Sequence, residues 1–448
     1  MTRPPPPRAP RSDRQSPSGR SPSGRRGGPV RPPEPLGTAT RRAALRLLDA
    51  VLRRGEALEA ALPAATRALH GGPDRGLAHA IAAETLRWLP DLDRLIDSAT
   101  RLPLAHDVKA RSALRIALAQ ALGLRTPPHA AIATVLPLVD GGPRKLVHGV
   151  FGTLMRQGVA LPARPTLPDP VAERWTTQWG DEMVARAAAA IAAPPPLDIS
   201  LADPEQTDAW AERLGGTSLL PGHVRIHDPA PVPDLPGYQE GGWWVQDIAA
   251  SLPVRLLGPV GGDRRALDLC AAPGGKTCQL AAAGWRVTAV DQSATRLERL
   301  RANLARTGQS ADVVEADVLG WSPPAPADAV LLDAPCSATG IFRRHPDVLY
   351  RAHPALIADM AALQAQILLR AADWVRPGGR LVYATCSLEP DEGERQLDAF
   401  LAARPDFRLA DAHALAPDLN GPVVRTLPGR FGGDGGSDGF FVAALDRG

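Results

Sequence analysis

The chain has 448 residues, of which 44% are hydrophobic and 22% charged, a composition typical of a folded protein with two or three domains. No apolar run approaches the roughly 18 residues of a membrane helix, so we expect no membrane partner. The four cysteines form no CxxC pair, which argues against a disulfide framework or a metal site and favours a reducing cytoplasm. Residues 1–40 hold eight Arg against two acidic residues, a charge of +6, so the remaining residues carry −3 of the total of +3. Nucleic-acid binding by the folded part therefore needs a local basic patch.

In chain order, residues 1–40 are rich in Pro, Ser, Gly and Arg and predict a disordered tail, with an arm that binds phosphates as the alternative. Residues 41–160 carry apolar side chains at helical spacing and predict an all-α domain. Residues 161–170 contain repeated prolines and are interpreted as a linker.

Residues 171–240 predict a small α/β module, with a helix on either side of a short strand at 197–201. Beyond residue 240, short apolar runs alternate with helical stretches. This rhythm predicts a doubly wound, Rossmann-like α/β domain over residues 241–448. Its expected strands are 266–270, 287–291, 313–317, 329–333 and 381–385.

The first of these strands runs into a glycine turn. Gly274 and Gly275 allow the backbone to turn tightly and approach a ligand, and the next helix presents free amide groups. Asp291 ends the second strand, where it can accept hydrogen bonds from ribose hydroxyls, and Asp317 ends the third, where it can receive an adenine amino group. The turn lacks the P-loop spacing and the third glycine of GxGxxG. This set predicts S-adenosylmethionine as cofactor rather than NAD.

Three reactive side chains follow the next two strands. Asp333 and Cys336 follow the fourth strand and Cys386 the fifth, so we expect them in one crevice above the cofactor. A buried strand-end cysteine is more often inert packing, but two beside an aspartate at a cofactor cleft indicate chemistry.

The three groups suit methylation of cytosine at C5. A thiolate adds to C6 and makes C5 nucleophilic, while a carboxyl group near N3 and the exocyclic amine distinguishes cytosine from uracil. The target base must be rotated out of its stack. The residues alone leave open which cysteine attacks, and whether Cys336 or water removes the C5 proton.

Residues 171–448 resemble the RNA cytosine-5 methyltransferases. The motifs that carry the resemblance are 242–249, 268–277, 333–340, 343–347, 383–387 and 438–441. The resemblance implies that Cys386 is the nucleophile and that Cys336 helps to release the product. It also implies that the cofactor site is lined by Cys270, Ala271, Ala272, Pro273, Gly274, Gly275, Lys276, Asp291, Asp317 and Asp333.

The helical region resembles the N-utilisation substance B family of RNA-binding antitermination factors at 41–48, 114–120, 129–132 and 145–150. Fusion of such a domain to the methyltransferase is typical of bacterial members that act on small-subunit (16S) rRNA, which implies that substrate. We expect a monomer. The alternatives are a tRNA cytosine-5 methyltransferase and a non-catalytic RNA-binding ribosome assembly factor.

Two positions depart from the family pattern. Ala338 stands where the family usually has Gly, beside Cys336. Residues 198–201 stand where the family commonly has an Arg-x-Asn strand in its RNA-facing module.

Overall fold

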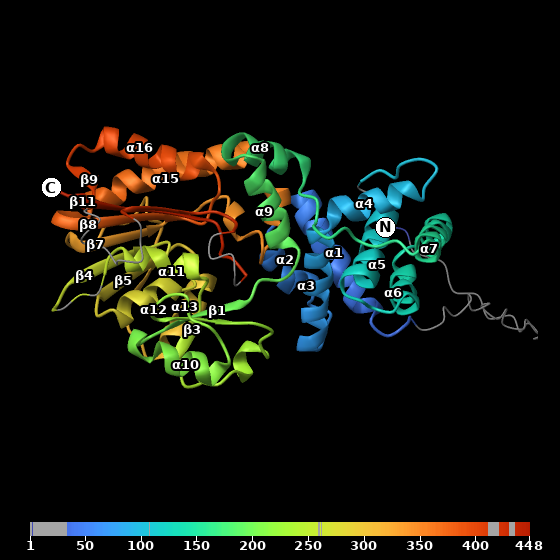
Figure 1. Cartoon of the computed structure of the whole chain (residues 1–448), viewed down its shortest axis with the longest axis horizontal. Coiled ribbons are helices and arrows are strands. Elements are labelled where there is room, and N and C mark those ends of the chain that lie inside the picture. Colours follow the sequence, from blue (N-terminus) through green and yellow to red (C-terminus); the bar gives the residue numbers. More distant parts are fainter. Residues whose placement is uncertain are drawn as a thin grey trace, which may run out of the picture.

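The computed structural model describes residues 2, 34–106, 108–258, 260, 262–410, 421–429 and 435–448, which form a helical part and a larger α/β part (Figure 1). The predicted tail falls mostly outside these described residues. Residues 38–40 are an exception, because they form the first turn of helix α1. Thr38 and Thr40 are buried, and the Thr40 hydroxyl lies 3.1 Å from a carboxylate oxygen of Asp74. The helical domain therefore begins earlier than the sequence predicted.

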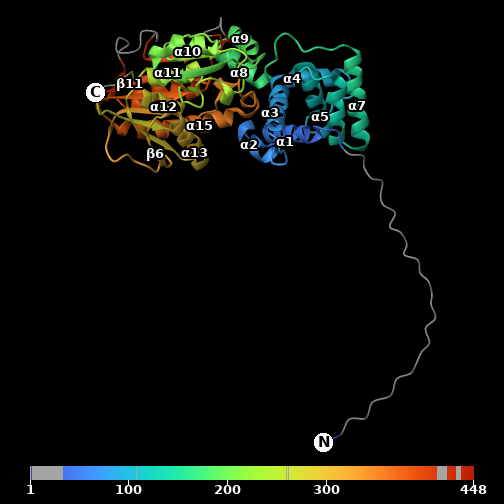
Figure 2. The same cartoon turned by 90° about the horizontal axis from the view of Figure 1, so that it is seen from below.

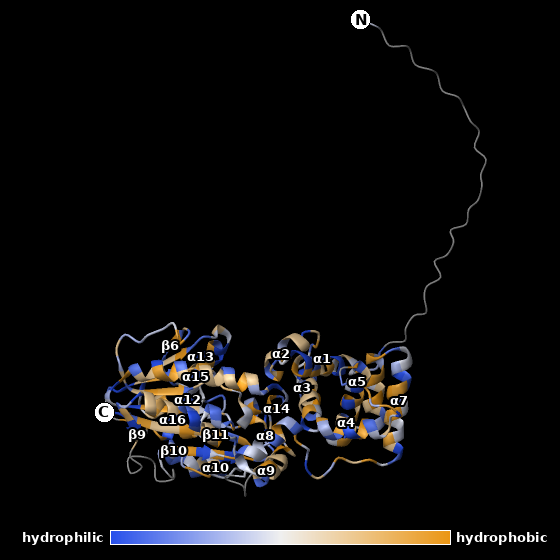
Figure 3. Cartoon of the chain, turned by 90° about the horizontal axis from the view of Figure 1, so that it is seen from above, coloured by the Kyte–Doolittle hydropathy of each residue, from blue (hydrophilic) through white to orange (hydrophobic). Residues whose placement is uncertain are grey.

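The helices of the N-terminal part pack around one apolar core. Their bounds are α1 (Thr38–Arg54), α2 (Leu58–Ala65), α3 (Gly72–Arg87), α4 (Leu89–Ser98), α5 (Lys109–Leu118), α6 (Pro128–Val135) and α7 (Gly141–Arg156). Leu114 and Leu118 of α5 and Val147 and Leu154 of α7 are buried in this core, at the predicted helical spacing. Figure 3 shows hydrophobic and hydrophilic residues along the same helices, as amphipathic helices around a shared core require.

The middle of the chain forms a helix pair and a small sheet. The elements are α8 (Asp169–Trp179), α9 (Asp181–Ile191), β1 (Leu197–Leu201), α10 (Thr207–Leu214), β2 (His223–Ile226) and β3 (Trp243–Val245). The sheet is antiparallel in the order β2-β1-β3, so its last strand lies beyond residue 240. Trp175 of α8 packs against Phe342 with ring centroids 5.5 Å apart, so the helix pair leans on the C-terminal domain.

The C-terminal part is built on an eight-stranded sheet. Its strands are β4 (Arg265–Leu269), β5 (Arg286–Asp291), β6 (Asp312–Glu315), β7 (Ala327–Asp333), β8 (Val375–Thr385), β9 (Phe407–Leu409), β10 (Val423–Thr426) and β11 (Phe440–Arg447). The order is β10-β11-β8-β7-β4-β5-β6, with β9 on β11; the strands from β8 to β6 are parallel and β11 is antiparallel. The doubly wound sheet predicted from the sequence is confirmed.

Helices cover both faces of this sheet (Figure 1). They are α11 (Ile248–Arg255), α12 (Gly275–Ala282), α13 (Ala294–Thr307), α14 (Val348–Arg351), α15 (Pro354–Asp373) and α16 (Glu394–Ala403). Helices α15 and α16 share a core with one face, and α11 and α12 share a core with the other. Among the described residues, α15 alone has the length and composition to cross a membrane; 33% of its apolar window is buried, and Ile367 and Leu368 pack in the sheet core.

The helical domain lies beside the C-terminal domain (Figure 2). It contacts that domain through the segment that precedes and forms α14, which Figure 3 labels next to α3. A carboxylate oxygen of Asp347 accepts a hydrogen bond from the amide of Leu58, 3.1 Å away, at the N-terminus of α2. Helix N-termini favour such a carboxylate. The hydroxyl of Tyr350 donates to the carbonyl of Leu86 at 2.7 Å. The end of motif 343–347 thus joins the two domains.

Candidate active site

A cavity of about 310 Å³ opens at the carboxyl ends of the parallel strands. It lies where the strand order reverses, between β4 and β7, which is where ligands bind in doubly wound sheets. The residues predicted from the sequence that line it are Cys270, Asp291, Asp317, Asp333, Cys336 and Cys386. The prediction that both thiols and the Asp333 carboxyl open into one crevice is confirmed.

The glycine turn after β4 lines a second cavity, of about 420 Å³, which shares Asp333 with the first. The predicted residues around it are Ala271, Ala272, Pro273, Gly275 and Lys276. Gly274 serves the turn itself: its φ is 100°, and a Cβ there would lie 2.8 Å from Cγ of Leu300. A side chain at this position would therefore be strained and would collide with α13.

The two strand-end acids differ in burial. Asp291 is buried at the end of β5, and its two oxygens accept backbone hydrogen bonds from Ala272 at 3.1 Å and Ser293 at 2.9 Å. One of these oxygens also lies 3.5 Å from a guanidinium nitrogen of Arg296, whereas the oxygen that binds Ser293 has a further lone pair that can accept from a hydroxyl. Asp317 is exposed and lies beyond the end of β6 at Glu315, so the third strand ends earlier than predicted.

Asp333 lies beside a lysine whose side chain is only 11% exposed. The Nζ atom of Lys276 is 2.7 Å from Oδ2 of Asp333 and 5.1 Å from the ring centroid of Phe440. Burial opposes the charge on Lys276, but the neighbouring Asp333 raises the pKa of the lysine above its ordinary value. Lys276 is therefore a cation that fixes the Asp333 carboxylate at the junction of the two cavities.

The thiols of Cys336 and Cys386 form a pair, with their sulfurs 3.4 Å apart. The hydrogen bond with Cys386, followed by burial, raises the pKa of Cys336 well above the usual value, so the Cys336 thiol holds its proton more tightly than an ordinary cysteine does. Cys270 and Cys278 have no such partner thiol. Burial raises the pKa of Cys270 to about 12 and also raises that of Cys278. Within the described part of the chain, no three His, Cys, Asp or Glu side chains gather as a metal site.

A buried carboxyl that the sequence did not single out lies next to the cysteine loops. Glu392 accepts hydrogen bonds from Ser337 and Ser387, the residues that follow Cys336 and Cys386. The serine after each cysteine is the only sign of this contact in the sequence.

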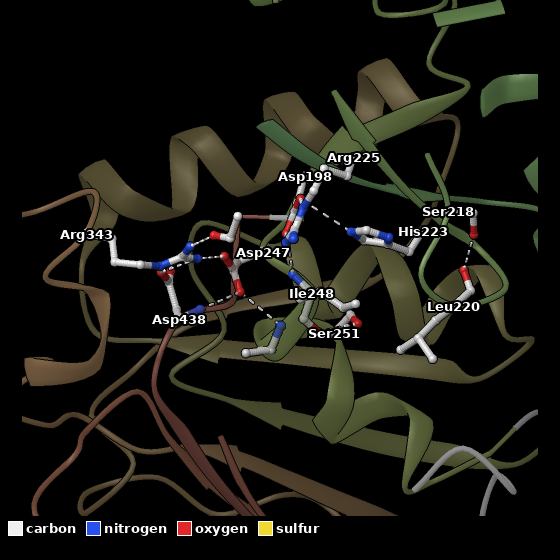
Figure 4. Close-up of polar contacts among 12 residues, drawn as sticks. Asp198, Ser218, Leu220, His223, Arg225, Asp247, Ile248, Ser251, Arg343 and Asp438 are labelled. Carbon is white, nitrogen blue, oxygen red and sulfur yellow. Dashed lines mark hydrogen bonds and ion pairs between the residues drawn. The ribbon is translucent and has the colours of Figure 1, made fainter. Parts of the chain in front are cut away.

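Three of the sequence motifs meet in one buried ion cluster (Figure 4). Arg343 is 3.0 Å from a carboxylate oxygen of Asp247 and 3.0 Å from one of Asp438. Arg344 contacts the same two carboxylates, at 3.1 and 3.7 Å. Burial, followed by repulsion from Asp247, raises the pKa of Asp438 to about 7. The cluster ties the stretch after Cys336 to the start of α11 and to the turn before β11.

Asp198, in the strand that departs from the family pattern, is fully buried. Each of its oxygens is 2.7 Å from a guanidinium nitrogen of Arg225, and one also accepts the amide hydrogen of Ile248 at 3.1 Å (Figure 4). The Asp198 side chain therefore connects the small sheet to α11 and does not lie on the surface of the module.

The doubly wound sheet, its glycine turn and its strand-end carboxylates define an S-adenosylmethionine-dependent methyltransferase, here joined to a helical RNA-binding domain. A solved structure described as the crystal structure of PH0851 covers 92% of this chain and 99% of its own, with a TM-score of 0.67 and 22% identity. NSun6 from Pyrococcus horikoshii with SFG covers 62% of this chain and 98% of its own, with a TM-score of 0.53 and 20% identity. At these identities the likeness shows the fold.

Sequence comparison gives the family. The model for 16S rRNA methyltransferase RsmB/F matches residues 254–446, and the NusB family model matches residues 38–152. The ribosomal RNA small subunit methyltransferase B of Klebsiella pneumoniae (strain 342) is 34% identical over 435 residues, which cover 90% of this chain and 96% of the relative. That of Cronobacter sakazakii is 34% identical over 429 residues, covering 90% and 97%. The chain belongs to the RsmB/F family and is an S-adenosylmethionine-dependent rRNA methyltransferase with a NusB-family domain. The resemblance inferred from the sequence motifs is confirmed.

Proposed function

We propose that this chain methylates C5 of a cytosine in small-subunit (16S) rRNA through a covalent bond between Cys386 and C6 of the base. The observation that carries the proposal is the pair of sulfurs, 3.4 Å apart in the cavity that Asp333 also lines. A ring nitrogen or a hydroxyl oxygen carries its own lone pair and needs no thiol to become a methyl acceptor. C5 of cytosine becomes nucleophilic only after a thiolate adds to C6.

The donor set of the two cavities fits the proposed cofactor contacts. We assign these to residues 270–276, Asp291, Asp317 and Asp333. The acids offer acceptors for ribose hydroxyls and an amino group, and the glycine turn brings backbone amides close. S-adenosylmethionine, when bound there, supplies the methyl group.

Cys386 acts as a thiolate. Its electron pair forms the bond to C6, and the π electrons of C5–C6 move into the ring and make C5 electron-rich. The raised pKa of Cys336 favours its protonated form, which can donate a hydrogen bond to the Cys386 sulfur and so supports Cys386 as the nucleophile. Asp333, fixed by Lys276, accepts a hydrogen bond from the exocyclic amine, where uracil presents a carbonyl instead.

Release of the product reverses the addition. A base, either a water molecule or Cys336 after it has given up its own proton, takes the C5 proton after methylation. The electrons of the C–H bond re-form the C5–C6 double bond, and the pair of the S–C6 bond returns to Cys386 as a thiolate.

The test uses the full-length protein, radiolabelled S-adenosylmethionine and unmodified small-subunit rRNA. Label should appear at C5 of a cytosine, mapped by bisulfite sequencing. Cys386→Ala should abolish transfer, whereas Cys336→Ala should accumulate an RNA adduct that survives denaturation. Cys278→Ala removes a thiol outside the pair and should accumulate no adduct. Label on tRNA instead would contradict the substrate, an adduct with Cys386→Ala would reverse the two roles, and RNA binding without transfer would favour a non-catalytic assembly factor.

We further propose that one chain suffices, as a monomer in the cytoplasm. The helical domain, which begins with α1 at Thr38, the small module, which extends through β3, and the methyltransferase domain together supply the RNA-binding and reactive groups, with the stretch between α7 and α8 as linker. Light scattering should find one protein per rRNA molecule; a stable dimer on the RNA would contradict this.

A further inference from the structure

Glu392 ends the short 3-10 turn η6 (Pro390–Glu392) after β8, and its side chain is fully buried. A carboxylate in the protein interior is costly unless hydrogen bonds replace its hydration. Here Oε1 accepts from the backbone amide of Ser337 at 2.8 Å and from the amide of Gln364 at 3.1 Å. Oε2 accepts from the hydroxyl of Ser387 at 2.5 Å and from the hydroxyl of Ser337. All four donors converge on one side chain.

These contacts lie beyond the end of the β7–β8 pairing, between the loop that follows β7 and contains Cys336 and the loop that follows β8 and contains Cys386 (the two cysteine loops). The pairing of β7 with β8 ends at Asp333 and Ala384, before either catalytic cysteine. Beyond that point, the amide of Gly340 donates to the carbonyl of Cys386 at 3.0 Å. Side chains add further links: the hydroxyls of Ser337 and Thr339 lie 3.2 and 3.3 Å from that of Ser387, and the Thr339 hydroxyl accepts from the amide of Leu388 at 2.9 Å. Glu392 differs from these links because it binds the residue after each cysteine on one carboxylate.

The carboxylate is itself held in place. The backbone carbonyl of Glu392 accepts from the hydroxyls of Tyr383 at 2.7 Å and Thr385 at 3.2 Å, both on β8. Gln364 of α15, which donates to the carboxylate, also donates to the carbonyl of Pro335 at 2.8 Å. A shift of Glu392 would therefore disturb β8, α15 and both cysteine loops at once.

We propose that Glu392 is the positioning residue of the cysteine pair, acting through Ser337 and Ser387 to keep both sulfurs within reach of one base. This inference rests on the proposed function, in which Cys386 attacks and Cys336 aids release. Glu392 touches neither sulfur nor base in the described contacts, so its effect is on geometry. The charge of Glu392 also raises the pKa of Cys336. This contribution is smaller than those of Cys386 and of burial.

Glu392→Gln keeps the shape of the side chain but replaces one acceptor by a donor that faces the serine hydroxyls. We expect kcat for rRNA methylation to fall on the order of 100-fold, as for a misplaced catalytic group, with KM for rRNA and the cofactor Kd unchanged. Asp398→Asn, an exposed acid of α16, is the matched control and should retain wild-type kcat. A Glu392→Gln kcat within about threefold of wild type, or equal losses of cofactor affinity and kcat, would overturn the positioning role.

A double-mutant cycle tests whether Glu392 acts through the serines. Ser337→Ala and Ser387→Ala should each lower kcat, and adding Glu392→Gln should cost less than the sum of the separate losses. Additive losses would overturn the inference.

A measurement without RNA separates this inference from the proposed function. Phenylarsine oxide bridges two thiols that lie close together, so it should bind the wild-type pair on the order of tenfold more tightly than the pair in Glu392→Gln. Equal binding would overturn the positioning role even if methylation proceeds as proposed. Tighter wild-type binding in a protein that methylates no RNA would support the positioning and refute the function.

Discussion

Replacing Arg343 by Met should destabilise the fold far more than the same change at Arg344, although both guanidiniums contact the same two carboxylates. The Arg343 side chain is 2% exposed and lies 3.0 Å from both Asp247 and Asp438, whereas Arg344 is 26% exposed, at 3.1 and 3.7 Å. Removing one partner of a buried ion pair leaves a buried charge and costs about 3–5 kcal/mol. A solvent-accessible pair contributes about 0.2–1 kcal/mol.

The loss at Arg343 should also grow with pH. Burial, then repulsion from Asp247, raises the pKa of Asp438 to about 7, and Arg343 opposes that rise. A carboxyl whose folded pKa lies above its unfolded value of about 3.9 favours folding below the unfolded value and loses that contribution as pH rises through the folded pKa. Without Arg343 the folded pKa lies higher still. The Met variant therefore carries its largest penalty above neutral pH.

Urea unfolding followed by tryptophan fluorescence, at about pH 5 and about pH 8, measures both effects on the wild type, Arg343→Met and Arg344→Met. The free energy of unfolding should fall by about 3–5 kcal/mol for Arg343→Met at the higher pH and by clearly less at the lower pH. Equal losses for the two variants, or a loss at Arg343 that is the same at both pH values, would refute the electrostatic reasoning.

Two further changes test local features of the fold. Burial opposes the charge on Asp198, but the ion pair with Arg225 holds the pKa of this carboxyl far below its usual range. The pair therefore stabilises the protein fully above about pH 4, and its contribution falls as the pH falls. Arg225→Met should cost about 3–5 kcal/mol near neutral pH and less near pH 3 in thermal melts followed by circular dichroism; a constant difference would contradict this. Ala338 has a φ of 58°, a left-handed conformation that costs an L side chain about 1–2 kcal/mol, against about 0.5–1 kcal/mol of backbone entropy for glycine. Ala338→Gly should therefore raise the free energy of unfolding by up to about 1 kcal/mol, and a lower midpoint in calorimetry would count against it.

The sheet and the crevice were predictable because both depend on local patterns. Short apolar runs separated by helical stretches gave the positions of β4, β5, β7 and β8, and the strand-end rule then brought Asp333, Cys336 and Cys386 together. The limits of the small module were not predictable in the same way. Its third strand, Trp243–Val245, is defined by pairing with β1 about forty residues earlier, and no local pattern reveals such a partner.

The role of Glu392 illustrates what a sequence pattern leaves open. Glu389, Asp391, Glu392 and Glu394 stand within one acidic stretch, and composition does not distinguish them. The structure distinguishes them, because the loops after β7 and β8 place Ser337 and Ser387 within hydrogen-bond distance of the Glu392 carboxylate. Such contacts depend on the approach of segments about fifty residues apart, which periodicity does not report.

Burial also changes the interpretation of the basic motif 343–347. Two adjacent arginines close in sequence to Cys336 would ordinarily indicate contacts with RNA phosphates. Here both guanidiniums face Asp247 and Asp438, so their charge is already compensated inside the protein. Asp347, at the end of the same motif, accepts a hydrogen bond from the amide of Leu58 at the N-terminus of α2. The motif therefore fixes the path of the chain from Cys336 to the helical domain.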